Sequence, residues 1–362
     1  MELQFLSMRV IIILVAFVSL FSSCIKQVSL NLPAQAAQLV VEGLLLTDST
    51  PCKVTLSYSG IFNSVGGQVQ NFINDATVFV KDGLGDSTQL LNIGSGVYTP
   101  STTMYAQVGM SYSLAITLSN GKRYVSIPET IAAVPKDFSL DTIAEGLPDN
   151  LSLSGLQAAD IQIKTQDPAN EKNYYRWTNS AYVSRQSGGT ACCLGCVVPP
   201  VCNNFCNQYY PNDTAIRVLS DENINGTEIR HQNVLLAPYY ATGTYYVLLR
   251  QMSLTQNVYQ FWKLYNQQTS NTGGILDPLP ASLQGNIYNA NDSTDVALGY
   301  FEASDVVSLR LILFPTFINP QATLSLAPNF ISPGACAGDY PNTSYNPPSA
   351  WDNAPMVIYN VY

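Results

Sequence analysis

The chain carries the alternating run YSLAITL at Tyr112–Leu118, then the turn residues Ser119-Asn-Gly121, then a second run, YVSI, at Tyr124–Ile127. Alternating segments on either side of an Asn-Gly pair are a strong local signal for a β-hairpin. Comparable strand-like runs come earlier, at Leu39–Leu46, Cys52–Tyr58 and Ala76–Val80. Short strands at this spacing, separated by turn residues, predict an antiparallel sandwich and a mostly β protein.

Three glycine–tyrosine motifs accompany these runs, namely Gly96-x-Tyr98, Gly109-x-x-Tyr112 and Gly121-x-x-Tyr124. They resemble carboxypeptidase-regulatory-like and transthyretin-like modules, in which the glycines turn the chain and the tyrosines close the edge of the core. The resemblance predicts an Ig-like or transthyretin-like sandwich domain over residues 37–130.

A second domain is expected after the proline-bounded stretch Pro128–Pro135. It should cover residues 137–362, be rich in β-strands and contain one amphipathic helix at residues 254–268. The helix is predicted from an apolar stripe at helical spacing, which comprises Leu254, Val258, Phe261, Trp262 and Tyr265. Such a stripe is more often core packing against a sheet than a ligand-binding surface.

The ends of this helix are also predicted. Ser253 or Thr255 can cap its start, because a hydroxyl oxygen accepts a hydrogen bond from a free amide of the first turn. Gly273-Gly274 is expected to end it.

The N-terminus has the pattern of a secretory signal. Arg9 is followed by a continuous apolar run at Val10–Phe21. This run is shorter than the about 20 residues that a transmembrane helix needs, and it fits a signal-peptide core. Two serines then precede Cys24, as in a bacterial lipobox. We expect residues 1–23 to be removed, Cys24 to be acylated and residues 24–36 to form a lipidated tether; the alternative is an ordinary signal peptide with an incidental cysteine.

The composition excludes several classes of protein. Of 362 residues, 46% are hydrophobic and 11% are charged, so the chain can bury a large core and is not globally disordered. The net charge is −9 and the 16 Lys and Arg residues are scattered, which argues against a nucleic-acid partner. The single histidine, His231, excludes paired-histidine metal sites and is expected at the surface or at a sheet edge.

The chain has eight cysteines. All except Cys24 are disulfide candidates, because an extracytoplasmic protein favours disulfides. Most lie in a Cys-rich loop predicted at residues 188–212, and the candidates are Cys52, Cys192, Cys193, Cys196, Cys202, Cys206 and Cys336. An odd number leaves one unpaired, and the connectivity stays open. The alternatives are zinc, since Cys193-x2-Cys196 and Cys202-x3-Cys206 have ligand-like spacings, and free thiols.

Catalytic motifs are absent from the sequence. It has neither a Gly-x-Ser-x-Gly elbow nor a phosphate-binding Gly-x4-Gly-Lys loop. The carboxylate pairs Asp292/Asp295 and Glu302/Asp305 could serve glycoside hydrolysis or calcium binding. They fall in predicted turns, where aspartate is common for structural reasons. We expect no enzymatic activity, no cofactor and no metal site.

Several segments, in collinear order over the mature chain, resemble one known family. They are Leu30-x-Leu32-Pro33 with Leu39-Val-Val-Glu42-Gly43, Asn173-Tyr174-Tyr175-Arg176-Trp177, Leu254-Thr-Gln-Asn-Val-Tyr259-Gln-Phe-Trp262-Lys-Leu, Asn271-x-Gly273-Gly-Ile-Leu-Asp277-Pro278-x-Pro280, Leu283-x-Gly285-Asn286-Ile-Tyr288 and Leu298-Gly299-Tyr300-Phe301. The family is the Bacteroidota lipoprotein family known as domain of unknown function 4249. Its members are often encoded beside TonB-dependent outer-membrane receptors, which implies an accessory role in uptake.

The resemblance therefore implies a lipid-anchored outer-membrane protein that is a non-enzymatic accessory of a TonB-dependent transporter and contacts the receptor or its ligand. The alternative is a surface adhesin or an envelope-structural protein, which the uncharged, Tyr- and Asn-rich composition suggests. A glycan-active enzyme is a third hypothesis. Surface-exported lipoproteins of this phylum tend to carry acidic residues after the acylated cysteine, whereas Cys24-Ile-Lys-Gln-Val28 has none. The periplasmic or cell-surface face of the outer membrane is thus left open.

The same phylum O-glycosylates exported proteins at an Asp that is followed by Ser or Thr and then by a small or apolar residue or Thr. Five triplets of this kind occur, and their acceptor residues would be Ser49, Ser87, Thr142, Thr214 and Ser293. Asp-Ser and Asp-Thr pairs are also common turn chemistry, so a purely structural role is the alternative.

Overall fold

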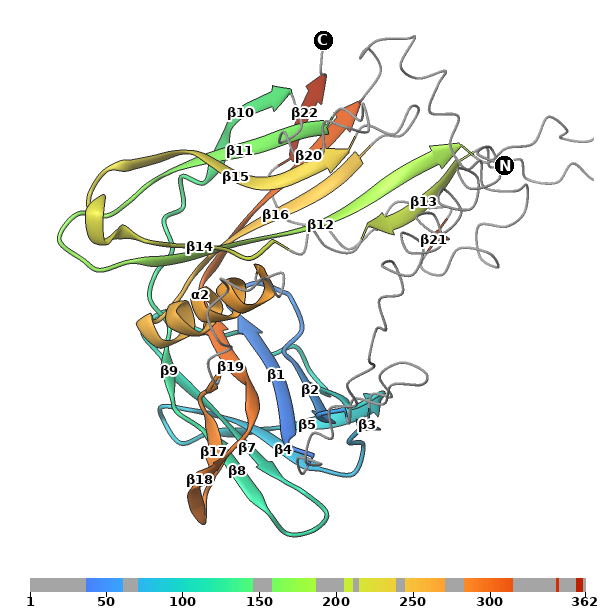
Figure 1. Ribbon diagram of the computed structural model, residues 1–362, viewed down its shortest axis with the longest axis vertical. Coiled ribbons are helices and arrows are strands. Elements are labelled where there is room, and N and C mark those ends of the chain that lie inside the picture. Colours follow the sequence, from blue (N-terminus) through green and yellow to red (C-terminus); the bar gives the residue numbers. More distant parts are fainter. Residues whose placement is uncertain are drawn as a thin grey trace, which may run out of the picture.

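The computed structural model describes residues 37–60, 71–145, 158–186, 205–210, 215–238, 245–270, 283–314, 343–344 and 356–360. This part of the chain forms two β-rich lobes that are stacked end to end (Figure 1). The helix α2 (Gln256–Ser270) lies where the lobes meet. We call the lobe that contains the N-terminal strands the first lobe and the other the second lobe.

The first lobe is built on one sheet, and its described strands are β1 (Leu39–Leu46), β2 (Lys53–Tyr58), β3 (Asn71–Phe72), β4 (Thr77–Asp82), β5 (Ser87–Gly94), β6 (Val97–Pro100), β7 (Ser111–Thr117), β8 (Arg123–Ser126), β9 (Glu129–Thr130), β17 (Ile287–Asn289), β18 (Asp292–Val296) and β19 (Leu298–Ser304). The sheet has the order β18-β17-β8-β7-β4-β5-β6-β2-β1-β19. Strand β3 pairs with β2, and β9 pairs with β7.

The hairpin expected around the Asn-Gly pair is present as β7 and β8. Ile116 lies opposite Tyr124 in an antiparallel register. The side-chain oxygen of Asn120 accepts a hydrogen bond from the Lys122 amide at 3.0 Å. Gly121 has a φ of 85°, which residues with a side chain rarely adopt. The turn residues therefore have the role that the sequence pattern predicts.

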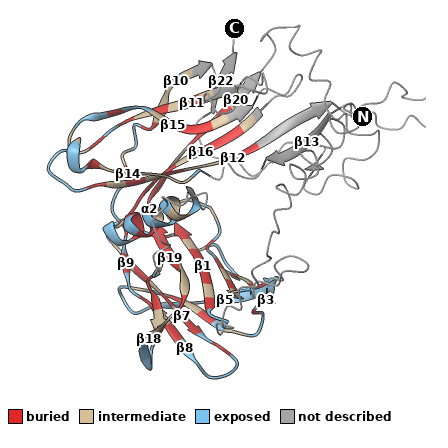
Figure 2. Ribbon diagram, in the orientation of Figure 1, coloured by how far each residue is buried: buried red, intermediate tan, exposed pale blue. Residues whose placement is uncertain are grey.

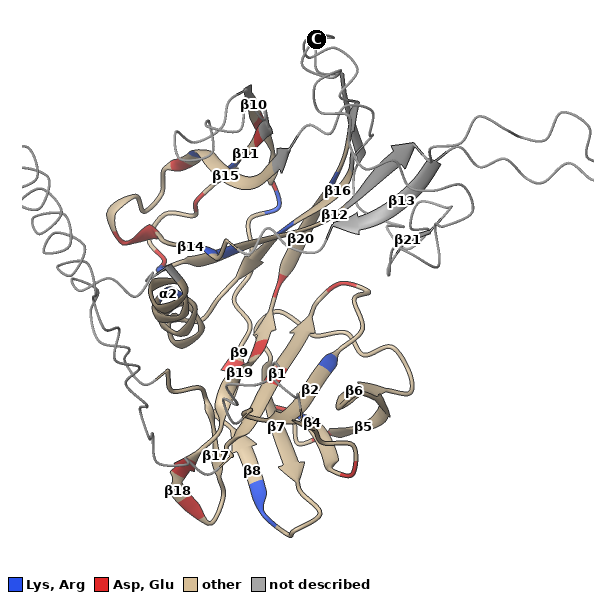
Figure 3. Cartoon of the chain, turned by 45° about the vertical axis from the view of Figure 1, so that its right-hand side comes forward, with Lys and Arg blue, Asp and Glu red and all other residues tan. Residues whose placement is uncertain are grey.

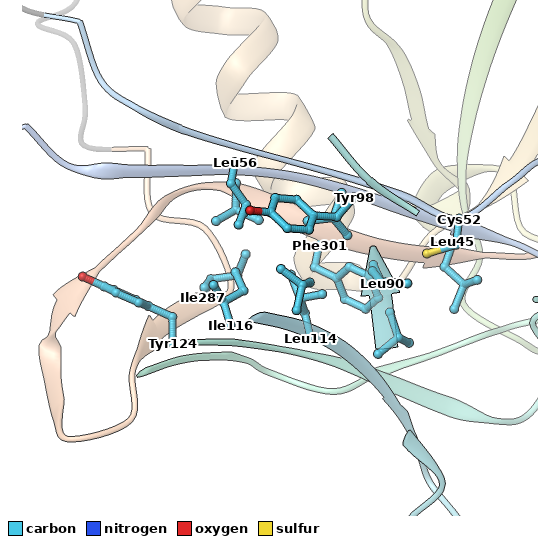
Figure 4. Packing of buried hydrophobic residues seen from close by; sticks show 14 of the residues in the cluster. Leu45, Cys52, Leu56, Leu90, Tyr98, Leu114, Ile116, Tyr124, Ile287 and Phe301 are labelled. Atoms are coloured by element: carbon cyan, nitrogen blue, oxygen red, sulfur yellow. The ribbon is translucent and has the colours of Figure 1, made fainter. Parts of the chain in front are cut away.

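The tyrosines of the three glycine–tyrosine motifs close the core of the first lobe. Tyr98, Tyr112 and Tyr124 are all buried. The Tyr98 hydroxyl donates to the Ile73 carbonyl and accepts from the Ala76 amide, both at 3.0 Å, so its polar end is satisfied inside the core. Figure 4 shows Tyr98 and Tyr124 among the aliphatic side chains of this core.

The predicted division into residues 37–130 and 137–362 needs a correction. Residues 287–304, expected in the second domain, belong to the sheet of the first lobe, where β17 pairs with β8 and β19 pairs in parallel with β1. Ile287 and Phe301 lie in the core of that lobe (Figure 4). A parallel pair joins strands through a long connection, and the local pattern of β19 carries no information about its partner.

The second lobe has two sheets, and its described elements are β10 (Ser139–Glu145), β11 (Ala158–Gln166), β12 (Tyr174–Gln186), β13 (Phe205–Tyr210), β14 (Arg217–Ser220), the 3₁₀ turn η2 (Asp221–Asn223), β15 (Glu228–Pro238), β16 (Tyr245–Ser253), β20 (Val306–Phe314), β21 (Thr343–Ser344) and β22 (Met356–Asn360). One sheet has the order β10-β11-β15. The other has the order β21-β13-β12-β16-β20-β22, and β14 pairs with β12.

These two sheets pack on a common core. Ile161 and Leu235 from the first sheet meet Trp177, Leu249 and Leu311 from the second. Figure 2 shows that buried residues follow the strands in both lobes. The second lobe is therefore a β-sandwich, and the mostly β fold class predicted from the sequence is confirmed.

Helix α2 is present, displaced by two residues from the predicted range of 254–268. Thr255 caps it, since its hydroxyl accepts a hydrogen bond from the Val258 amide at 3.3 Å. The predicted end at Gly273-Gly274 falls outside the residues that the structure describes. Within the described ranges, no helix is long and apolar enough to cross a membrane.

Candidate functional site

A cavity of about 1010 Å³ lies between the sheet of the first lobe and helix α2. One wall is the outer face of β1, β2, β6 and β19, and the opposite wall comprises aromatic side chains of α2 and Arg176 of β12. Its size is at the upper end of the range for pockets that hold small molecules. Both lobes contribute lining side chains, so the cavity exists only because the lobes meet as they do.

The sheet wall follows from strand alternation. Successive side chains of a strand point to opposite faces. Val41 and Leu45 of β1 therefore enter the core, whereas Val40, Glu42 and Leu44 line the cavity. The same alternation operates in β2 and β19. The side chains that these two strands present to the cavity are Lys53, Thr55, Leu298, Tyr300 and Glu302. The wall is mainly apolar and carries a few charged side chains.

The helix wall is aromatic. Phe261 is buried and packs on Tyr300 with 4.9 Å between ring centroids. Trp262 and Tyr265 meet edge to face at 5.7 Å. The sequence predicted that this stripe packs in the core. That is correct for Leu254, Val258 and Phe261, which are buried, whereas Tyr265 is exposed. The cavity lining includes Phe261, Trp262 and Tyr265.

Arg176, Trp262 and Glu302 form the polar centre of the cavity. The Arg176 guanidinium donates to Glu302 Oε2 at 2.7 Å and lies 3.7 Å from the centroid of the Trp262 ring. The indole Nε1 of Trp262 donates to the same oxygen at 2.8 Å. Ser304 donates to the other carboxylate oxygen at 3.2 Å. Both oxygens of Glu302 are thus occupied, and its side chain is 3% exposed.

Two further buried carboxylates lie at the junction. Figure 3 shows acidic positions in β9 and β19, where the two lobes meet. Glu129 accepts hydrogen bonds from Thr255 and Tyr300 at 2.6 Å and from Asn286 at 3.0 Å. Burial raises the pKa of its carboxyl group above the ordinary value, and these three hydrogen bonds only partly oppose the rise.

Asp305 follows β19 and holds the connection between the lobes. It accepts hydrogen bonds from Thr47 at 2.6 Å, from the Val134 amide at 2.9 Å and from Lys136 at 2.8 Å. Burial disfavours its ionised form, but these donors, with Lys136 the strongest, outweigh burial and hold the pKa of Asp305 below its ordinary value. The residue therefore stays ionised at neutral pH.

The pairs Asp292/Asp295 and Glu302/Asp305 are not in turns as predicted. Asp292 and Asp295 lie in β18, and Glu302 lies in β19. Asp292 accepts hydrogen bonds from the amide and the hydroxyl of Thr294. Glu302 and Asp305 are buried and have protein partners. Among the described residues, no group of His, Cys, Asp and Glu is arranged to hold a metal ion.

One disulfide candidate is corrected by the structure. Cys52 has a free, fully buried thiol in the core of the first lobe. It was a candidate because extracytoplasmic cysteines usually pair, but here it acts as a small apolar side chain. Cys206 lies in β13. The other cysteines lie outside the described residues and include Cys24, Cys192, Cys193, Cys196, Cys202 and Cys336.

The candidate O-glycosylation residues that the structure describes are all exposed, and they are Ser49, Ser87, Thr142 and Ser293. Thr214 lies outside the described part of the chain. The preceding aspartates also have local roles. Asp48 accepts a hydrogen bond from the Thr50 amide at 2.9 Å, which is the turn chemistry that the sequence offers as the alternative. Exposure and turn formation are compatible, so modification stays a prediction.

His231 is exposed, as predicted. It lies in β15 with a φ of 54°. Its amide donates to Asp141 Oδ2 at 2.9 Å, and its Nδ1 lies 3.1 Å from the same oxygen. These contacts connect β15 to β10 at the far side of the second lobe and have no relation to the cavity.

Sequence reasoning named Glu302 as a candidate carboxylate and Trp262 as a core residue, but it did not bring them together with Arg176 in one site. Arg176, Trp262 and Glu302 come from three elements that are far apart in the chain. Arg176 and Trp262 stand in the segments that carry the family resemblance, which was the available signal. Glu302 was expected in a turn, because nothing local distinguishes a buried carboxylate in a strand from one in a turn.

The solved structures that resemble this chain include a two-domain fibronectin type III segment from chicken tenascin. The similarity covers 59% of this chain and 90% of that chain, with 12% sequence identity and a TM-score of 0.17. No curated protein matches the sequence.

Comparison with family descriptions gives a match over residues 25–310 to the family described as domain of unknown function (DUF4249). The match covers more than half of the chain. It spans both lobes, the cavity and all the segments from Leu30 to Phe301 that carry the resemblance noted in the sequence. The chain therefore belongs to the family described as domain of unknown function (DUF4249).

Proposed function

We propose that this protein is an outer-membrane lipoprotein that acts as a non-enzymatic accessory of a TonB-dependent transporter. It contacts the transporter or its ligand. The observation that carries the proposal is the cavity between the lobes, with its aromatic wall, its mainly apolar sheet wall and a polar centre at Arg176 and Glu302. Concave, largely apolar pockets with a few oriented polar groups are the usual form of ligand sites.

The state of the buried carboxylates favours binding over chemistry. A general acid or base must be free to reach a proton of the substrate. Glu302 is instead held by Arg176, Trp262 and Ser304. Glu129 and Asp305 are likewise engaged with protein donors. Their arrangement is suited to holding two lobes at a constant distance around a ligand.

The N-terminal sequence supports the anchor. The apolar run at Val10–Phe21 and the two serines before Cys24 fit cleavage and acylation at that cysteine. Acylation of a lipoprotein cysteine adds more than one chain, and two or more chains make membrane attachment stable. The tether at residues 24–36 would then connect the membrane to β1.

The test is a pull-down of the tagged full-length lipoprotein from gently solubilised outer membranes, read by mass spectrometry. A stoichiometric TonB-dependent receptor is the expected result. Cys24→Ser is the control, since it should release the protein from the membrane fraction and remove incorporation of labelled fatty acid. Repeated recovery of the membrane-bound protein alone would contradict the transporter role and favour an adhesive or envelope-structural role.

A further inference from the structure

The cavity wall carries two charged side chains of opposite sign that do not pair. Glu42 of β1 and Lys53 of β2 both line the cavity and are solvent-exposed. Within the residues that the structure describes, neither forms an ion pair or a side-chain hydrogen bond. The other charged lining residues, Arg176 and Glu302, are bonded to each other at 2.7 Å. Glu42 and Lys53 are therefore the charges of the cavity that remain for a ligand.

The register of the sheet places these two charges close together. Glu42 lies opposite Thr55, and Lys53 lies opposite Leu44. Glu42 and Lys53 are thus diagonal neighbours on adjacent strands. Residues in such diagonal positions are about 7–8 Å apart. An extended chain spans about 3.3–3.6 Å per residue. A separation of this size is the length of about two residues of an extended peptide, and the long, flexible Glu42 and Lys53 side chains can reach the ends of a peptide one residue longer.

The rest of the lining is suited to an uncharged, apolar body. The sheet wall contributes Val40, Leu44 and Leu298, and the helix wall contributes Trp262 and Tyr265. Aromatic side chains supply a large apolar contact area and a polar edge for hydrogen bonds. Thr55 lies on the same wall, opposite Glu42 and two residues from Lys53 on β2, and its hydroxyl can donate to or accept from a backbone amide.

We propose that the cavity binds short peptides that have apolar or aromatic side chains and free termini. The peptide ammonium group pairs with Glu42, its carboxylate pairs with Lys53, and its side chains contact the aromatic wall of α2. This inference rests on the proposed binding role of the cavity and names the class of ligand.

Charge complementarity favours this class over others. A bound ligand displaces water from the wall, and a charge that loses water without gaining a partner is destabilising. A fatty acid would pair with Lys53 and leave Glu42 against its apolar chain. A neutral glycan would leave both charges without an ionic partner. A ligand with both charges at the ends of an apolar body satisfies Glu42 and Lys53 together.

The test is calorimetric titration of the detergent-solubilised mature lipoprotein with the tripeptide Leu-Tyr-Leu. Three forms are compared: free termini, acetylated N-terminus and amidated C-terminus. Binding of the free form is expected, and each block should weaken it by about two- to five-fold, the range of a partly exposed ion pair. Glu42→Gln should abolish the effect of acetylation alone. Lys53→Met should abolish the effect of amidation alone.

Matched substitutions outside the cavity are the controls. Glu222→Gln and Lys81→Met make the same chemical changes at exposed positions, and both should bind all three peptides as the unaltered protein does. Thermal unfolding of every variant checks that it is folded. Lack of binding at about 1 mM of the free tripeptide, or equal binding of free and blocked forms, overturns the proposal. Tight oleate binding that depends on Lys53 and not on Glu42 also overturns it.

The two proposals fail in different experiments. If the transporter co-purifies but the tripeptide does not bind, the ligand class is wrong and the accessory role stands. If the tripeptide binds with the expected dependence on Glu42 and Lys53 but no transporter co-purifies, the ligand class stands and the accessory role is wrong.

Discussion

Glu302 is the residue that connects the two lobes across the cavity. It lies in β19 of the first lobe and accepts hydrogen bonds from Arg176 of the second lobe and from Trp262 of helix α2. All three side chains are buried or half-buried. Removing one partner of a buried ion pair leaves an uncompensated charge in a medium of low dielectric constant, which costs about 3–5 kcal/mol.

Arg176→Met is therefore expected to lower the free energy of unfolding by about 3 kcal/mol, measured by urea denaturation. Adding Glu302→Gln to this variant should recover part of the loss, because the unpaired buried charge is then gone. A double variant whose loss equals the sum of the two single losses would contradict direct coupling between the residues.

Cys52 is expected to be unreactive in the native protein. Burial raises the pKa of its thiol to about 12, so at pH 8 the thiolate is about 10⁻⁴ of the total, and the side chain has no exposed surface. Maleimide labelling followed by peptide mass spectrometry should leave Cys52 unmodified until denaturant is added. Rapid labelling of the native protein would show that the core of the first lobe opens.

Glu129 is expected to make stability fall as pH rises. Its folded-state pKa is raised above the ordinary value by burial. Between the ordinary pKa and the raised pKa, the folded protein holds a proton that the unfolded chain has released, so the free energy of unfolding decreases with pH in that window. The loss in free energy of unfolding caused by Glu129→Gln, measured by urea denaturation against the unaltered protein, should therefore become smaller as pH rises through the window. A cost that grows with pH would contradict the raised pKa.

At the scale of elements, β19 depends on a close approach to β1. Gly299 has a φ of 86°, and a Cβ atom there would lie 2.0 Å from the Val41 carbonyl oxygen. This glycine allows β1 and β19 to pair in parallel, which brings Glu302 and Tyr300 into the cavity wall.

Gly299→Ala is expected to destabilise the protein by more than about 3 kcal/mol, because the strained conformation alone costs about 1–3 kcal/mol and the backbone clash adds to it. Gly85→Ala is the matched control. Gly85 has a φ of 98° with nothing within 4 Å, so it bears the conformational cost without the clash. Equal losses in thermal unfolding would show that β19 can move away from β1 at no cost.

At the scale of the whole molecule, the first lobe is discontinuous in sequence. Strands β17–β19 complete its sheet after the chain has formed most of the second lobe. Phe301 and Ala303 of β19 and Ile287 of β17 are buried in the first-lobe core. The early part of the chain thus lacks side chains that its own core requires.

A fragment of residues 37–136 is therefore expected not to fold cooperatively, whereas residues 37–314, which contain β17–β19, should fold. Circular dichroism during thermal unfolding distinguishes the two outcomes. A sharp unfolding transition in the short fragment would show that β17–β19 add to a lobe that is already complete.

Much of the fold could be predicted from local patterns. The β7–β8 hairpin follows from alternation around Asn120-Gly121, helix α2 follows from its apolar stripe, and the burial of Tyr98 and Tyr124 follows from their place after turn glycines. These features depend on residues that are neighbours in the chain. Local backbone preference and side-chain period are sufficient to specify them.

The tertiary structure alone decided which lobe β17–β19 join, that Cys52 is a free core residue, and that Glu302 meets Arg176 and Trp262. Each of these depends on contacts between segments that are remote in sequence. The periodicity of a strand does not reveal these contacts, because it is the same whichever partner the strand pairs with. The sequence by itself determined the mostly β architecture and the family, and it predicts a lipid anchor at Cys24. The cavity arises only when the two lobes pack, because its opposite walls belong to different lobes.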